Sequence, residues 1–157
     1  MSVGKIKQTS IDVPHDLRRE VRTQFGALCW RLNKDKVEIL LITSRRSGRW
    51  IVPKGWAVEG ATPAGAAQTE AWEEAGAEGK VETECLGIYS YNKAGVGEHE
   101  SLPCVVALFP MRVRRLIKDY PEAGQRRRKW FAQKKAASLV DEPELREIIR
   151  QFSPRKG

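Results

Sequence analysis

The sequence is poor in the side chains that build many metal and redox centres. It contains two histidines, His15 and His99, and so excludes a catalytic centre made of several imidazoles. Its three cysteines, Cys29, Cys85 and Cys104, are far apart and lie among apolar residues, which argues against a disulfide framework or a zinc site. We therefore expect buried, reduced cysteines.

Long apolar runs are also absent. No segment approaches the roughly 18 apolar residues of a membrane-spanning helix, and no apolar stretch typical of a secretory signal follows the amino terminus. With 41% apolar and 31% charged residues in 157, the composition is that of a globular protein. We expect a single domain over 1–157, with its core at about residues 20–152 and flexible termini, in a cytoplasmic protein that has no membrane partner.

Positive charge is concentrated near the carboxyl end. The net charge is +8, and residues 1–110 carry equal numbers of basic and acidic side chains, so the excess lies in residues 111–157. Guanidinium groups match phosphate oxygens and favour a polyanionic partner, while a solvated face is the alternative interpretation. The densest clusters are Arg112, Arg114 and Arg115, and then Arg126, Arg127, Arg128 and Lys129.

Apolar and turn residues predict a mixture of strands and helices. β-Branched and aromatic residues at 21–32 and 37–44 flank a polar turn, which predicts a β-hairpin, and an irregular loop is expected after Pro53. The other elements predicted are strands at 49–52, about 81–91, 103–113 and 128–131, and a helix at 142–152.

The clearest helix lies between Thr62 and Gly76. Thr62 suits the N-cap, Pro63 suits the first helical position, and the residues that follow are strong helix formers. Gly76 can end the helix in a left-handed conformation.

Three carboxylates lie within one turn of this helix. Glu70, Glu73 and Glu74 are spaced to share a face, where like charges repel and the carboxyl-terminal dipole is unfavourable. A cation would neutralise the cluster, and a site of carboxylates and water suits Mg²⁺ or Mn²⁺ better than zinc. A solvated acidic face is the alternative interpretation.

Residues Gly55–Ala77, GWAVEGATPAGAAQTEAWEEAGA, resemble the Nudix box, G-x5-E-x7-R-E-U-x-E-E-x-G-U with U apolar. The complete E-U-x-E-E-x-G segment is present at the required spacing. The earlier TSRRSGRWIVPKG and the later RRRKWF resemble segments of diphosphoinositol-polyphosphate and diadenosine-polyphosphate phosphohydrolases. This resemblance covers roughly residues 20–140 and implies an α/β fold, the Nudix-type α/β/α sandwich with a mixed β-sheet.

Two positions depart from the box. Ala61 stands where the family has its first Glu, and Thr69 stands where it has an Arg that helps to orient a catalytic carboxylate. Glu59 is two residues early and is a weak substitute for the first Glu. The three retained glutamates leave the metal-binding triplet intact, but the two departures put the catalytic rate in doubt.

The resemblance implies a chemistry and a set of site residues. The family cleaves pyrophosphate linkages with divalent cations, which neutralise phosphate charge and activate water. By resemblance, Glu70 and Glu74 are Mg²⁺ ligands, with Mn²⁺ as the alternative ion, and Glu73 is the catalytic proton acceptor. The residues expected to bind substrate are Arg45, Lys54, Gly55, Arg126 and Arg128, whereas alternation along strands would send Arg46 and Arg127 to the opposite face.

Other conspicuous residues have plainer interpretations. Trp72 on the predicted helix is interpreted as a packing residue rather than a base-stacking one, as are Trp30, Trp50 and Trp130. His99, with Glu98 and Glu100, could assist proton transfer from a polar loop, although an ordinary exposed loop is the favoured interpretation.

The leading hypothesis is a Mg²⁺-dependent phosphohydrolase for a small, highly phosphorylated substrate, such as a diphosphoinositol polyphosphate or a diadenosine polyphosphate. One alternative is an RNA 5′-pyrophosphohydrolase, but RNA is the less favoured partner because no aromatic-rich platform for a single strand is evident. The other is a degenerate Nudix module that binds nucleotide or nucleic acid without turnover, which Ala61 and Thr69 favour. The substrate, the number of metal ions and the oligomeric state stay open.

Overall fold

The computed structural model describes residues 22–94 and 101–154, and His15, Glu98, His99 and Glu100 lie outside this part of the chain. No helix within it is long and apolar enough to cross a membrane. Its strands are β1 Arg22–Asn33, β2 Lys36–Thr43, β3 Trp50–Ile51, β4 Lys54–Trp56, β5 Ala77–Val81, β6 Gly87–Ala94, β7 Ser101–Leu116 and β8 Arg128–Ala132. Its helices are α3 Pro63–Ala75, α4 Gln133–Leu139 and α5 Pro143–Gln151.

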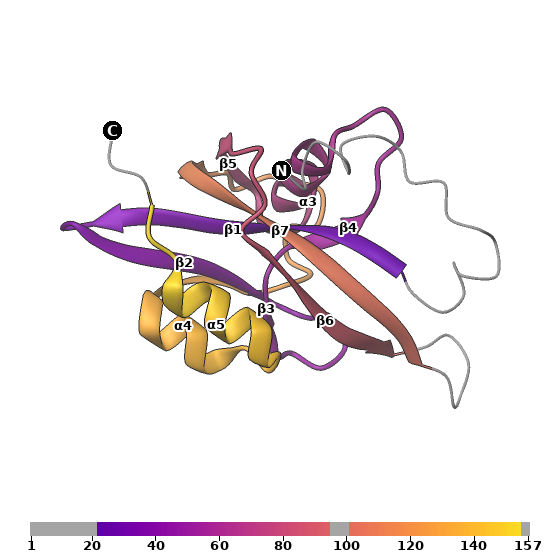
Figure 1. Ribbon diagram of the computed structural model, residues 1–157. Coiled ribbons are helices and arrows are strands. Elements are labelled where there is room, and N and C mark those ends of the chain that lie inside the picture. Colours follow the sequence, from indigo (N-terminus) through magenta and orange to yellow (C-terminus); the bar gives the residue numbers. More distant parts are fainter. Residues whose placement is uncertain (1–21, 95–100, 155–157) are drawn as a thin grey trace.

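The strands form one mixed sheet between helices. The central order is β3-β2-β1-β7-β5, with β4 paired to β1, β6 to β7 and β8 to β2. Strands β1 and β7 run parallel, and the other pairs are antiparallel. Helix α3 covers one face of the sheet, and α4 and α5 cover the other (Figure 1). The expected α/β/α sandwich with a mixed sheet is therefore confirmed.

Side-chain alternation along β1 builds both halves of the core. Ala27 and Cys29 pack in the cluster that includes α3, whereas Leu28 and Trp30 pack in the cluster that includes α4 and α5. Successive side chains on a strand point to opposite faces, so a strand covered on both sides is buried along its length. The central strands are thereby fixed as a rigid platform for α3.

Several local predictions are confirmed. The hairpin forms with Lys34 at φ 51° and Asp35 at φ 65°, the pair of positive angles that matches the twist of the two strands. At the start of α3, the Thr62 hydroxyl accepts a hydrogen bond from the Gly65 N–H at 3.0 Å. Gly76 ends the helix at φ 64°.

Some boundaries and burial states differ from expectation. A single strand at about 81–91 is wrong, because a turn separates β5 from β6 although the N–H groups of Glu82 and Leu86 still bond to β7 carbonyls. Strand β4 and helix α4 were not predicted; β4 forms despite the preceding Pro53 because it pairs with β1. All three cysteines are free, as expected, but only Cys29 and Cys104 are buried, whereas Cys85 is exposed.

We expect Gly76→Ala to destabilise the protein by about 2–4 kcal/mol. A side chain there would adopt a left-handed conformation and would also meet the Ile117 carbonyl oxygen at 2.8 Å. Gly48 has a similar φ of 69° but open space around it, so Gly48→Ala should cost only about 1 kcal/mol. Urea denaturation of both variants measures the difference; equal losses would contradict the proposed crowding at Gly76.

Candidate active site

Glycine at position 55 makes room for a carboxylate of α3. Strand β4 passes beside the helix, and a Cβ atom built on Gly55 would overlap the Glu70 carboxyl group. The sequence predicts that Gly55 binds substrate, and in the structure the space beside it holds the Glu70 carboxyl group. Gly55 therefore sets the position of a glutamate from the box.

Glu74 is held in place from two sides. Its side chain is 10% exposed, its Oε1 accepts the Lys54 backbone N–H at 3.2 Å, and its Oε2 lies 3.6 Å from Nη2 of Arg126. Burial raises the pKa of Glu74, while the charges of Arg126 and Lys54 oppose that rise. This carboxylate has one fixed orientation.

Glu70 is in direct contact with Glu74. The Glu70 carboxyl group lies against Gly55, and the Glu74 carboxyl group accepts the N–H of the preceding residue, Lys54, so the two carboxyl groups meet at the same short stretch of β4. Burial, followed by the charges of Glu74 and Glu73, raises the pKa of Glu70 to about 7. The pair is thus arranged to bind a positive charge.

Glu73 is the least engaged of the three glutamates. Its side chain is partly buried and makes no hydrogen bond or ion pair with any residue that the structure describes. Thr69, where the box has Arg, donates its hydroxyl to the Gly65 carbonyl at 3.0 Å and so does not orient Glu73. Ala61 and Glu59 are exposed in the loop before α3.

Arg126 occupies a buried position among oxygen atoms. Its side chain is 8% exposed; besides Glu74, it contacts Glu122 Oε1 through Nε at 3.0 Å and the Thr43 carbonyl through Nη1 at 3.2 Å. These contacts engage the guanidinium with protein oxygens, whereas the sequence predicts that it binds substrate. The structure gives Arg126 the task of fixing Glu74.

Glu122 is a site residue that the sequence analysis missed. It binds Arg126, four residues later, and lies 4.0 Å from Nη1 of Arg45, which also donates to Gln125 at 3.0 Å. The spacing of four between Glu122 and Arg126 was a usable signal. Arg45 has a side chain that is 57% exposed, so it stands at the edge of the site and stays open to solvent.

Arg128, which the sequence predicts to bind substrate, contacts the carboxyl end of α3 in the structure. Its Nη1 donates to the Ala75 carbonyl at 2.7 Å, and its guanidinium lies 4.8 Å from the centre of the Tyr120 ring. It therefore caps the carboxyl end of α3, where a positive charge is favourable. Arg127 faces the other side of the sheet, over Trp50, as strand alternation predicted.

Lys54 places a cation beside the carboxylates. Its Nζ lies 4.9 Å from the centre of the Tyr91 ring, and the Tyr91 hydroxyl donates to Gln24 Oε1 at 2.6 Å. Burial lowers the pKa of Lys54 to about 8, although Glu74 acts in the opposite direction. The charges of Lys54 and Glu74 thus act on each other, while the ammonium group lies over the Tyr91 ring.

Within residues 22–94 and 101–154, no group of three His, Cys, Asp or Glu side chains is placed to hold a metal ion by itself. The two touching carboxylates nevertheless suit Mg²⁺, which binds through one or two carboxylates and completes its shell with water and phosphate oxygens. The site thus supplies part of a metal shell and leaves positions for substrate.

Comparisons with known proteins agree with this arrangement. The model of the NUDIX domain matches residues 22–152. Nudix hydrolase 12 of Arabidopsis thaliana is 30% identical over 75% of this chain and 59% of its own length. Diphosphoinositol polyphosphate phosphohydrolase 3-alpha of mouse is 32% identical over 68% of this chain and 61% of its own. The chain thus spans about three fifths of these two relatives.

Solved structures share the fold. An Ap4A hydrolase of C. elegans has a TM-score of 0.60 at 20% identity and covers 82% of this chain and 93% of its own. The E. coli dihydroneopterin triphosphate pyrophosphohydrolase has a TM-score of 0.63 at 17% identity, with coverage of 83% and 93%. Together with the match over most of the sequence, the fold shows that this chain belongs to the NUDIX domain family.

Proposed function

We propose that this chain is a Mg²⁺-dependent pyrophosphohydrolase whose substrate is a small, highly phosphorylated molecule, of the diphosphoinositol polyphosphate or diadenosine polyphosphate class. The observation that carries the proposal is that the Glu70 and Glu74 carboxyl groups meet at β4, the first against Gly55 and the second on the Lys54 N–H, with Glu73 on the same turn of α3. The mouse relative is a diphosphoinositol polyphosphate phosphohydrolase and the C. elegans neighbour is an Ap4A hydrolase, which supports this substrate class.

Glu70 and Glu74 would hold the metal. When bound, Mg²⁺ would neutralise phosphate charge and lower the pKa of bound water. Mn²⁺ has the same preference for oxygen ligands and is the alternative ion. Gly55 keeps the Glu70 carboxylate close to β4, and Arg126 and the Lys54 N–H keep Glu74 in its orientation.

Glu73 would accept the proton of the attacking water. A general base needs a carboxylate that is near the metal ligands and not already committed to another donor. Glu73 satisfies both conditions, because its charge acts on Glu70 while its carboxyl oxygens make no hydrogen bond with any residue that the structure describes.

The substrate phosphates would meet Lys54 and Arg45. Lys54 lies next to the carboxylates, and Arg45 stands exposed at the edge of the site, where its guanidinium fork suits phosphate oxygens. In this proposal Arg126 is a positioning residue and Arg128 caps α3. The substrate-binding set that we propose is therefore smaller than the set expected from the sequence.

A Nudix module that binds without turnover is the second candidate. The observation in its favour is that the Thr69 hydroxyl is bonded to the Gly65 carbonyl, so no side chain from position 69 orients Glu73. Arg126 supplies a guanidinium to the cluster from another segment, which favours retained activity.

A substrate panel tests the proposed activity. Phosphate and nucleotide release would be measured with a diphosphoinositol polyphosphate, a diadenosine polyphosphate and 5′-triphosphorylated RNA, with Mg²⁺ and with chelator. We expect Mg²⁺-dependent release from one of the two small substrates. Release from RNA alone would favour the RNA alternative, and binding without release from any substrate would favour the inactive module.

We expect Gly55→Ala to reduce turnover by about a hundredfold. The added methyl group would displace the Glu70 carboxylate, and a shift of about 1 Å at a catalytic group has an effect of this size. Gly87→Ala is the control, because it adds a methyl group against the movable end of Ile148, at 3.0 Å, away from α3. Full turnover in Gly55→Ala, with the fold intact, would contradict the role given to Gly55.

A further inference from the structure

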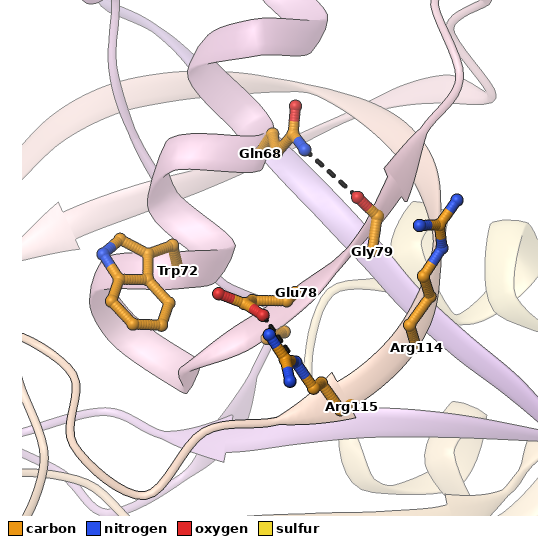
Figure 2. Close-up of a pocket in the computed structure, with 7 residues that line it drawn as sticks. Gln68, Trp72, Glu78, Gly79, Arg114 and Arg115 are labelled. Carbon is orange, nitrogen blue, oxygen red and sulfur yellow. Dashed lines mark hydrogen bonds and ion pairs between the residues drawn. The ribbon is translucent and has the colours of Figure 1, made fainter.

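A hollow of about 660 Å³ lies beside α3, and none of Glu70, Glu73 and Glu74 lines it. Six of the residues that line it carry the argument: Gln68, Trp72, Glu78, Gly79, Arg114 and Arg115. Its size is within the range of about 300–1,000 Å³ that small-molecule sites occupy. Figure 2 shows the Trp72 ring and the Arg114 guanidinium on opposite sides of the Glu78 and Arg115 pair.

Helical geometry separates this hollow from the candidate active site. Gln68 and Trp72 are four residues apart on α3 and share a face. Glu70 and Glu74 are each two positions further along, which is about 200° round the helix axis. A ligand in the hollow would thus lie on another side of α3 from Glu70 and Glu74.

An irregularity between β5 and β7 brings two arginines to the same place. Glu78 pairs with Arg115 and Gly79 pairs with Val113, so Arg114 is the extra residue of a β-bulge. In a regular strand Arg114 and Arg115 would point to opposite faces, whereas a bulge turns neighbouring side chains toward one face. Any side chain on Gly79 would collide with the Arg112 carbonyl oxygen, so glycine keeps the two strands close at this point.

Trp72 lies at this hollow instead of in the core. The sequence favoured a packing role, yet Trp72 belongs to neither core cluster, whereas Trp30 lies in one and Trp50 and Trp130 pack against them. Its ring is only partly buried and borders the hollow. An aromatic ring in this position is suited to stack against a planar group.

The two arginines are available to an anion. Arg114 makes no ion pair with the described part of the chain. Arg115 binds Glu78 at 2.8 Å, but the two side chains are 71% and 42% exposed, and an exposed pair contributes little stability. The Gln68 amide donates one N–H to the Gly79 carbonyl at 3.1 Å and keeps its own oxygen for another partner.

We propose that this hollow is a second ligand site and that it binds a nucleotide, with the base on Trp72 and the phosphate on Arg114 and Arg115. Every nucleobase can stack on an aromatic ring, and guanidinium groups pair with phosphate oxygens. Gln68 and Glu78 offer hydrogen-bonding groups to the edge of the base. The nucleotide is either free or one unit of a single strand.

Calorimetric titration with adenosine monophosphate, in chelator and without divalent metal, tests the site. Adenosine monophosphate has no phosphoanhydride bond, so the result does not depend on the proposed hydrolysis. We expect Trp72→Leu to weaken its binding at least about fivefold and Arg114→Ala to weaken it about tenfold. Inorganic phosphate should bind more weakly, and its affinity should depend on Arg114 but not on Trp72.

Two control variants test whether the binding depends on this hollow. Arg46→Ala removes an exposed positive charge elsewhere, and Glu70→Gln changes the other site, so both should keep the affinity for adenosine monophosphate. A tetraadenylate strand that binds more tightly, with the same dependence on Trp72, would assign the site to single strands; equal or weaker binding would assign it to free nucleotides. Absence of binding at millimolar concentration, or equal weakening by Arg46→Ala and Arg114→Ala, would overturn the proposal.

Discussion

Glu70→Gln is expected to lower Mg²⁺-dependent phosphate release by about a hundredfold or more, with no loss of thermal stability. The change removes a proposed ligand of Mg²⁺. The bound ion would stabilise the charge of the transition state by several kcal/mol, and this stabilisation would be weakened. The charges of Glu74, Glu73 and Glu122 all disfavour the ionised form of Glu70, so removing its charge relieves repulsion. Initial rates and thermal melts of the variant measure the two effects.

A matched control shows whether losing any one negative charge lowers turnover. Glu147 lies on α5 with a side chain that is 52% exposed, and Glu147→Gln removes the same charge away from α3. It should keep the parent's turnover. Equal turnover in Glu70→Gln and Glu147→Gln would contradict the carboxylate mechanism.

Arg126→Ala is expected to destabilise the protein by about 2–4 kcal/mol and to reduce turnover. Removing one partner of a buried ion pair leaves the other charges less compensated, and here both Glu74 and Glu122 would lose the guanidinium that they share. Denaturant unfolding gives the stability, and Arg127→Ala, which removes a neighbouring arginine that lies over Trp50, is the control. Equal losses in the two variants would contradict the buried network.

Kinetics distinguish the two roles considered for Arg126. If it positions Glu74, Arg126→Lys should lower kcat more than it raises KM, because the charge stays while the fork that fixes the geometry is lost. If Arg126 holds substrate phosphate directly, the main effect should be a rise in KM that grows with substrate charge. The second pattern would restore the interpretation made from sequence.

The local part of the site is what the sequence could predict. The caps at Thr62 and Gly76 and the spacing of three glutamates depend on residues within one helix, so periodicity and turn chemistry were sufficient. The room that Gly55 gives to Glu70 involves two neighbouring elements, and the motif marked the glycine without giving its contact.

The distant part of the site could not be predicted in the same way. Strand alternation correctly predicted that Arg127 faces the opposite side of the sheet from Arg126 and Arg128. It could not show that Arg126 contacts Glu74 and that Arg128 contacts the end of α3 instead of open solvent. Contacts such as that between Arg126 and the Thr43 carbonyl join segments more than 80 residues apart. They depend on the pairing of β2 with β8, which no local pattern specifies.

The most direct test of the account is whether the carboxylates of α3 bind a divalent cation. Mn²⁺ would be titrated into the protein, and the signal of free Mn²⁺ would be followed by electron paramagnetic resonance. The account predicts that the parent protein removes this signal and that a variant combining Glu70→Gln with Glu74→Gln does not. The same loss of signal with the double variant, folded as judged by its melting curve, would contradict a metal site at Glu70 and Glu74.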